Sequence, residues 1–231
     1  MKKIYQIIML CAMGIALASC GNSSKSSLFS NSGDYKEAVK QGDFETSHEI
    51  LEKLHDEVVA ANYSYEKQNA YLDAMDYVYK KEIQTILLND GAEAENKIVF
   101  LLSEIPIDGE CPSRGSIDYY YDSDFDVYCR FVASFNRLCD LALTLSLNRN
   151  NASFAQNVID LYKEDVKILP SATCVNGENV DGNHKYALFT NQSKNAALKK
   201  YNNAVNTGRF GDDVHVYEIV EDSIVITQGH I

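Results

Sequence analysis

Residues 41–58 read QGDFETSHEILEKLHDEV, and they contain a turn followed by an amphipathic helix. Gly42 is suited to the end of one helix, and Asp43 is suited to cap the next, because its carboxylate can accept hydrogen bonds from free backbone amides. The apolar residues recur at the spacing of one helix face: Phe44, Ile50, Leu51, Leu54 and Val58. The stretch therefore predicts two helices joined by a tight turn.

The same order of helix, polar turn and helix occurs three times between residues 34 and 170. The breaks lie near Gly42, Gly91 and Asn150. Hydrophobic periodicity predicts helices over 64–88, 92–105 and 119–147, and a further helix that ends at Leu169, before Pro170. Because a single hairpin cannot bury its apolar face alone, we expect the hairpins to stack into an array.

The first break resembles the junction of a tetratricopeptide repeat. The resemblance rests on Gly42-Asp43-Phe44 and on Ser47, Leu51 and Leu54, which stand at that family's small and large packing positions. Two features depart from the family: Ser47 replaces the usual Ala, and the turns do not follow the regular period of about 34 residues. The resemblance implies an all-α array of helical hairpins over residues 34–170.

Residues 171–231 have a different composition. A loop rich in Asn, Gly and Asp is predicted first, followed by an amphipathic helix over 191–206. Residues 214–227 are β-branched and apolar around an acidic break, which indicates a small β-hairpin. Such a hairpin is marginal alone, so it would have to pack on the helical body.

The composition is that of a globular protein and disfavours nucleic-acid binding. The chain has 231 residues, of which 45% are hydrophobic, so it can bury a sizeable core. Its formal net charge is -12, which disfavours a nucleic-acid partner because the chain repels phosphate backbones.

The first residues have the pattern of an export signal. Lys2 and Lys3 precede an apolar run, Ile4–Leu17, that is too short to cross a bilayer core, which needs about 20 residues. The run ends in Leu17-Ala18-Ser19-Cys20, which resembles the lipobox of bacterial lipoproteins. The resemblance implies that residues 1–19 are removed and that Cys20 carries diacylglycerol and acyl chains; an ordinary signal peptide is the alternative.

Residues 20–33 are then predicted to form a flexible polar tether. Residue 21 is Gly and not Asp, the residue that enteric lipoproteins associate with inner-membrane retention, and no acidic run follows Cys20. Both features favour the outer membrane, with the protein facing the periplasm.

Four cysteines remain after the lipobox: Cys111, Cys129, Cys139 and Cys174. Cys129 and Cys139 lie about 15 Å apart on one predicted helix, so they cannot pair with each other. Full pairing would join 111–129 with 139–174, or 111–139 with 129–174. The interpretation favoured here is that Cys129 and Cys139 are buried as small apolar residues of the helix.

His48, Glu52 and His55 share one helix face and are candidate metal ligands. A metal site would need a further ligand from another helix, and the two histidines also border the apolar stripe, where they could simply pack. We predict no metal and no cofactor other than the lipid. No catalytic motif occurs, so the sequence does not predict an enzyme.

Tyrosines are the candidate contact residues. Tyr119, Tyr120 and Tyr121 are consecutive, and Tyr63, Tyr65, Tyr77 and Tyr79 lie on the predicted second helix or just before it. Tyrosine is favoured at binding surfaces and equally completes cores. Together with the lipobox, the array resembles Gram-negative envelope lipoproteins with repeat-like bodies. The sequence thus predicts a lipid-anchored scaffold or adaptor that binds an envelope protein; a peptide- or glycan-binding module and an enzyme with scattered catalytic residues are the alternatives.

Overall fold

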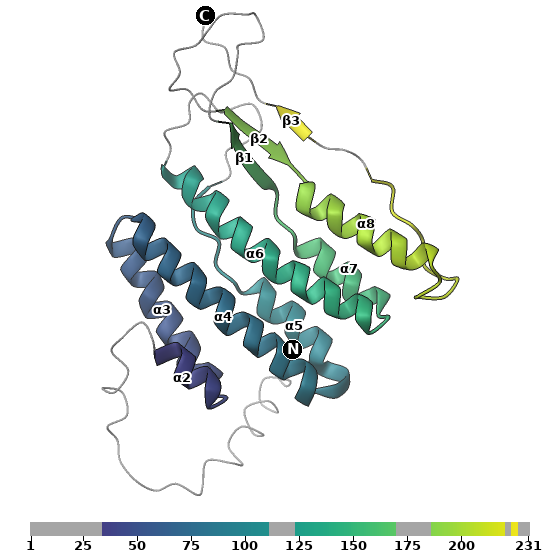
Figure 1. Ribbon diagram of the computed structural model, residues 1–231, viewed down its shortest axis with the longest axis horizontal. Helices are drawn as coiled ribbons and strands as arrows, with labels where there is room; N and C mark the ends of the chain where they lie inside the picture. Colours follow the sequence, from purple (N-terminus) through teal and green to yellow (C-terminus); the bar gives the residue numbers. More distant parts are fainter. Residues whose placement is uncertain (1–33, 111–122, 170–185, 220–222, 226–231) are drawn as a thin grey trace, which may run out of the picture.

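The computed structural model describes residues 34–110, 123–169, 186–219 and 223–225. Within them the fold is all-α in its body, as predicted, with seven α-helices and a small sheet (Figure 1). The α-helices are α2 Asp34–Lys40, α3 Phe44–Ala60, α4 Tyr65–Asn89, α5 Ala94–Ser103, α6 Ser123–Asn148, α7 Ala152–Leu161 and α8 Gln192–Asn206. A 3₁₀ turn, η2, spans Gly91–Glu93, and the strands are β1 Asp165–Leu169, β2 Tyr186–Thr190 and β3 Ser223–Val225.

The predicted turns form for the expected local reasons. Gly42 has a φ of +74°, which a residue without a Cβ adopts at little cost, and the Asp43 carboxylate accepts from the Thr46 amide at 3.1 Å. Asn151 caps α7 in the same way by accepting from the Phe154 amide at 2.9 Å. Ser47 is fully buried, and its hydroxyl donates to the Asp43 carbonyl at 2.8 Å. This bond lets a serine replace the usual alanine at a packed position.

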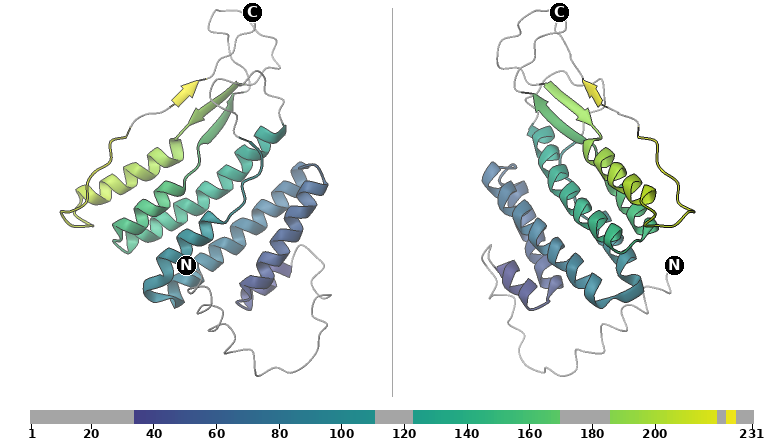
Figure 2. Two further views of the ribbon diagram at one scale, coloured as in Figure 1. Left: turned by 180° about the vertical axis from the view of Figure 1, so that it is seen from behind. Right: turned by 45° about the vertical axis from the view of Figure 1, so that its right-hand side comes forward.

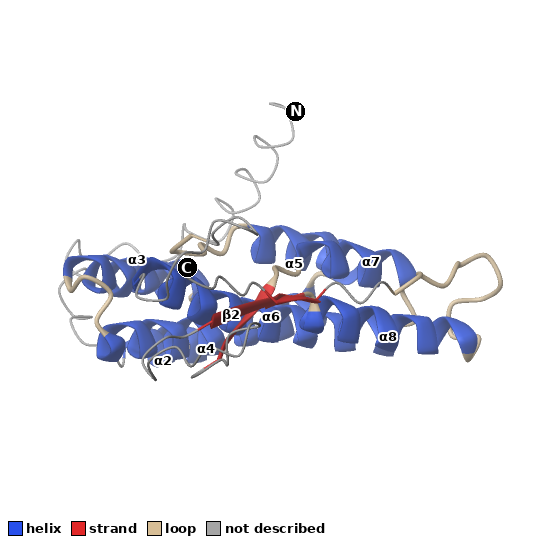
Figure 3. Cartoon of the chain, turned by 90° about the horizontal axis from the view of Figure 1, so that it is seen from above, coloured by secondary structure: helices blue, strands red, loops and turns tan. Residues whose placement is uncertain are grey.

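The helices form two layers. Figure 3 shows α3, α5 and α7 in one layer and α2, α4, α6 and α8 in the other. Helix α4 packs between α2 and α6, α6 also packs on α8, and α5 packs on α7. The predicted array of helical hairpins is therefore confirmed, and α8 extends it beyond the third hairpin. No helix in the described part of the chain is long and apolar enough to cross a membrane.

Two predictions about the C-terminal half were wrong. Helix α7 ends at Leu161 and not at Leu169, because the side-chain amide of Asn136 binds both the N–H and the C=O of Lys163 at 3.2 Å. The chain then continues as β1, which pairs antiparallel with β2. A hairpin within 214–227 does not form either: 214–219 has no strand, and β3 pairs with β2 instead. The three strands lie in the order β1-β2-β3 at one end of the array (Figure 2).

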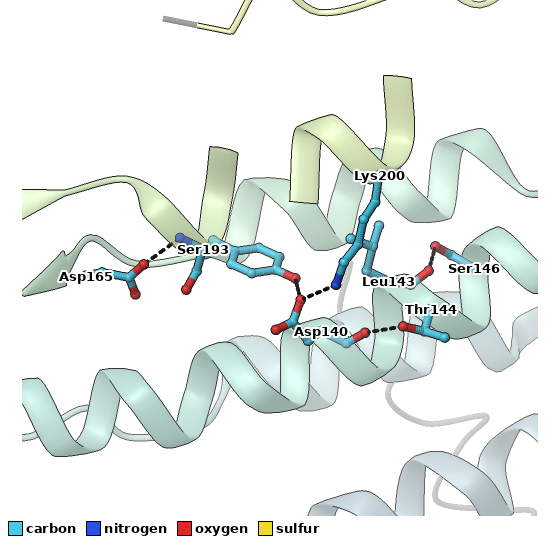
Figure 4. Close-up of polar contacts among 8 residues, drawn as sticks. Asp140, Leu143, Thr144, Ser146, Asp165, Ser193 and Lys200 are labelled. Atoms are coloured by element: carbon cyan, nitrogen blue, oxygen red, sulfur yellow. Dashed lines mark hydrogen bonds and ion pairs between the residues drawn. The ribbon is translucent and has the colours of Figure 1, made fainter. Parts of the chain in front are cut away.

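Polar contacts join helices α6 and α8 to the segment that enters the sheet. Asp140 of α6 accepts from Lys200 Nζ of α8 at 3.1 Å and from the Tyr162 hydroxyl at 3.0 Å (Figure 4). At the start of β1, Asp165 accepts from the backbone amide of Ser193 at the beginning of α8. These contacts hold α6, β1 and α8 together across a long separation in sequence.

Candidate functional site

A pocket of about 410 Å³ lies between α3, α4 and the segment that follows α5. The pocket lies beside the C-terminal end of α5. The lining residues are His48, Leu51, Glu52, His55, Asp56, Tyr71, Tyr79, Glu104 and Pro106. Two helices and a non-helical segment, separate in the sequence, therefore build one concave site.

The periodicity of α3 places its polar residues in the pocket. His48, Glu52 and His55 lie four and three residues apart, so they project from one face, as the sequence predicted. On α4, Tyr71 and Tyr79 lie two turns apart and face α3. The apolar residues Leu51 and Leu54 on the same side of α3 are buried and keep the two helices packed.

Each histidine forms the same kind of cluster. His48 Nε2 lies 2.6 Å from Glu82 Oε2 of α4, and its ring packs edge-on against Tyr79 with centroids 5.1 Å apart. His55 Nε2 lies 2.6 Å from Asp108 Oδ2, and its ring lies 5.2 Å from that of Tyr71. Two histidine–carboxylate–tyrosine clusters thus stand side by side along α3 and α4.

The three candidate metal ligands share the pocket but do not converge on one point. Each histidine directs its Nε2 atom to a different carboxylate. Among the residues that the structure describes, no group of three or more His, Cys, Asp or Glu side chains is placed to hold a metal ion. The shared face predicted for His48, Glu52 and His55 is real, whereas the ligand geometry is not present.

The hydroxyls of Tyr71 and Tyr79 have no hydrogen-bond partner within the described residues. Both side chains are more than nine-tenths buried, with 3% and 7% of their surface exposed, and both line the pocket. Burial raises the pKa of Tyr79 to about 12, and Glu82, Glu104 and Glu52 add to this effect. Burial also raises the pKa of Tyr71 above its ordinary value. Both phenols are therefore neutral and can donate and accept hydrogen bonds inside the pocket.

Because burial raises the pKa of several side chains, we expect the folded protein to lose stability at alkaline pH. Burial raises the pKa of Cys139 from 9.0 to about 12 and that of Tyr79 from 10.0 to about 12. In the unfolded chain both groups lose their protons at the lower values, so above pH 9 the unfolded state binds fewer protons than the folded state. The free energy of unfolding should therefore fall between pH 9 and 12, by on the order of 3 kcal/mol per group at the upper end.

Urea unfolding followed by circular dichroism at a series of pH values, with phenolate absorbance recorded in parallel, measures this loss. The Cys139→Ala chain should show a shallower decline, because one of the groups with a raised pKa is removed. A midpoint that stays constant from pH 8 to pH 12 would contradict the prediction.

The charge lining the pocket is negative. Glu52, Asp56 and Glu104 are exposed at its border. No Lys or Arg belongs to the described lining, although the histidines are the partners of two further acids, Glu82 and Asp108. Chemically, the arrangement offers carboxylate acceptors at the border, and at the floor it offers neutral phenols beside the carboxylate-paired imidazoles.

A second concave region of about 420 Å³ lies at the C-terminal end of α8, lined by Leu147, Lys200, Asn203, Ala204, Thr207 and Arg209. Its lysine already pairs with Asp140. The Thr207 hydroxyl donates to the backbone carbonyls of Asn203 and Ala204 in α8. These polar groups serve the packing of α8, so the acidic pocket is the stronger candidate site.

The remaining predicted residues fall in three groups. Cys139 is a free thiol with 0% exposure, and Cys129 is half-buried on the same helix; neither complete disulfide pairing is formed in this structure. Cys20, Cys111, Cys174 and Tyr119–Tyr121 lie outside the described residues. Of the other tyrosines, Tyr65 is 65% exposed and stacks beneath the Arg130 guanidinium at 4.0 Å, whereas Tyr79 is in the pocket.

Several pocket residues were not predicted from the sequence. Tyr71, Glu82, Glu104 and Asp108 reach the site from α4 and from the segment after α5. The one usable signal was spacing: the two tyrosines are eight residues apart and the two histidines seven, which matches two turns on each of two antiparallel helices. Comparisons of the chain with protein-family models, with curated proteins and with solved structures found no match.

Proposed function

We propose that this chain is a lipid-anchored protein of the bacterial envelope, most favourably placed at the outer membrane facing the periplasm, whose helical array binds an envelope protein as a scaffold or adaptor. The observation that carries the proposal is the pocket in the α3/α5/α7 layer, with two buried phenols that have no partner in the described chain. A pocket with hydroxyls that can still donate and accept hydrogen bonds is suited to hold a polar group of a ligand.

The architecture supports a binding role over a purely structural one. Stacked helical hairpins form extended surfaces whose residues come from several successive repeats. Here α3 and α4 belong to two different hairpins, and the segment after α5 supplies a third wall. The site therefore exists only when the hairpins are stacked.

The N-terminal sequence supports the place of action. The lipobox at Leu17–Cys20 would fix the protein to a membrane through several acyl chains, each buried methylene contributing about 0.8 kcal/mol. Residues 20–33 would then separate the helical body from the bilayer. Such an arrangement holds a binding surface at the membrane and leaves it accessible to a partner.

Photocrosslinking in living cells tests the proposal with the full lipidated chain. A photoreactive amino acid replaces Lys53 or Ser103, exposed residues that each adjoin a residue lining the pocket. The matched controls carry it at Asp160 on α7 or Lys199 on α8, which are equally exposed.

We expect one adduct of the same mass at both pocket positions, identified by mass spectrometry, and no such adduct at the control positions. The absence of any adduct at Lys53 and Ser103, in a protein that is folded and membrane-bound, would overturn the proposal.

A further inference from the structure

We propose that the acidic pocket binds the cationic end of a basic side chain, arginine or lysine, of a polypeptide partner. This inference rests on the proposed function and adds the chemistry that the partner must present. It arises from two independent features of the pocket: the sign of its charge, and the pair of phenol hydroxyls without partners.

The charge of the pocket selects for a cation. Glu52 and Asp56 approach from α3, and Glu104 approaches from the segment after α5. Behind them, Glu82 and Asp108 are engaged by the two histidines. Since no Lys or Arg side chain is part of the described lining, the three border carboxylates have no basic residue beside them in the pocket. An anionic or phosphorylated ligand would be repelled.

The tyrosines supply the second feature. Both side chains are buried and line the pocket together with Glu52 and Glu104 of its border. A guanidinium or ammonium group between them would donate N–H bonds both to the carboxylates and to the phenol oxygens. Binding would thereby give both hydroxyls hydrogen-bond partners, which neither has among the described residues.

The size and walls of the pocket fit one extended side chain. A volume of about 410 Å³ is at the lower end of the range for small-ligand sites. The aliphatic stem of a basic side chain can pack on Leu51 and Pro106, and the aromatic rings of Tyr71 and Tyr79 can contribute cation–π attraction. The same chain already places a guanidinium over a tyrosine ring at Arg130 and Tyr65.

The test measures binding of a capped Gly-Arg-Gly peptide to the full lipidated chain in lipid nanodiscs, by saturation-transfer NMR. Capped Gly-Lys-Gly and Gly-Gln-Gly peptides and free propylguanidinium are titrated alongside. We expect the Arg and Lys peptides to bind and the Gln peptide not to bind, because it has no positive charge. Propylguanidinium has the same single guanidinium charge but no backbone, and it should bind more weakly than the Arg peptide.

Two pairs of variants separate the pocket from the general negative charge of the protein. The Tyr71→Phe/Tyr79→Phe chain keeps every charge and removes only the hydroxyls, and Tyr77→Phe is its control on the same helix. The Glu52→Gln/Glu104→Gln chain is compared with Glu49→Gln/Glu93→Gln, which removes equal charge from exposed positions outside the lining. We expect each pocket variant to weaken binding of the Arg peptide by about tenfold, and each control to change it less than twofold.

Equal loss in pocket and control variants, or equal binding of the Gln peptide, would overturn the inference. Propylguanidinium that binds as tightly as the Arg peptide would support the cation site and overturn its assignment to a polypeptide. Failure of the proposed function is distinguishable: a crosslinked partner insensitive to the pocket variants would leave the scaffold standing without this site, whereas cation binding without any crosslinked partner would refute the scaffold.

Discussion

The Cys20→Ala chain should lose its lipid completely and no longer fractionate with the outer membrane. In the lipobox interpretation the Cys20 sulfur is the atom that receives diacylglycerol, and alanine has no atom that can take its place. Among the described residues, no helix has the length and apolar character that crossing a membrane requires. The expected effect is therefore all-or-none and not a change of degree.

Growth with an alkyne-tagged fatty acid, followed by immunoprecipitation and separation of the membranes, measures this result. Cys11→Ala is the matched control, because Cys11 also lies in residues 1–20 but precedes the lipobox. Its label and its membrane fraction should equal those of the unchanged chain. A Cys20→Ala chain that retains the label, or a Cys11→Ala chain that loses it, would refute lipidation at Cys20.

The helical part of the fold was predictable because it depends on local patterns. The predicted stripe of Ile50, Leu51, Leu54 and Val58 is buried, and the Gly42 and Asn150 turns have the positive φ that ends a helix. These features need only the 3.6-residue period and the chemistry of caps. No knowledge of distant residues was required.

The two wrong predictions for the C-terminal half have a common physical cause: side chains that are distant in the sequence bind the backbone. Val158, Tyr162 and Val166 continue a helical spacing, but Asn136 binds the backbone of Lys163 and redirects the chain into β1. Likewise, Asn202 of α8 exchanges two hydrogen bonds of 2.8 Å with the backbone of Tyr217, which occupies groups that a hairpin would need. Such contacts override local propensity and leave no periodic signal in the sequence.

The candidate site was half predictable for a similar reason. One helix carries His48, Glu52 and His55, so their shared face follows from the period alone. The partners of the two histidines depend on the register between α3 and α4 and on the path of the chain after α5. The helix spacing alone left metal binding and simple packing open for the histidines, and we predicted no metal. With the structure, their carboxylate partners and the phenols of the pocket suggest a site for an organic cation.

Phe131 links the stability of the array to this site. Its side chain on α6 has 0% exposure, and its ring lies 5.7 Å from Tyr71 and 6.3 Å from His55. It therefore supports the floor of the pocket from the neighbouring hairpin. Phe100 of α5 offers a matched comparison, because the same residue type is 62% exposed there.

The Phe131→Ala chain should lose about 3–5 kcal/mol in the free energy of unfolding, because the change removes buried apolar surface and leaves a cavity that the helices cannot fill. The Phe100→Ala chain should change by less than about 0.5 kcal/mol, since its ring is largely in water and alanine favours the helix. Urea unfolding followed by circular dichroism measures both, with the slope m compared to confirm that the same surface unfolds. Equal losses in the two chains would show that α6 does not pack against α4 as described. If Phe131→Ala remains folded in the absence of urea, its Arg-peptide binding should also weaken, because Tyr71 would no longer be held in place at the floor of the pocket.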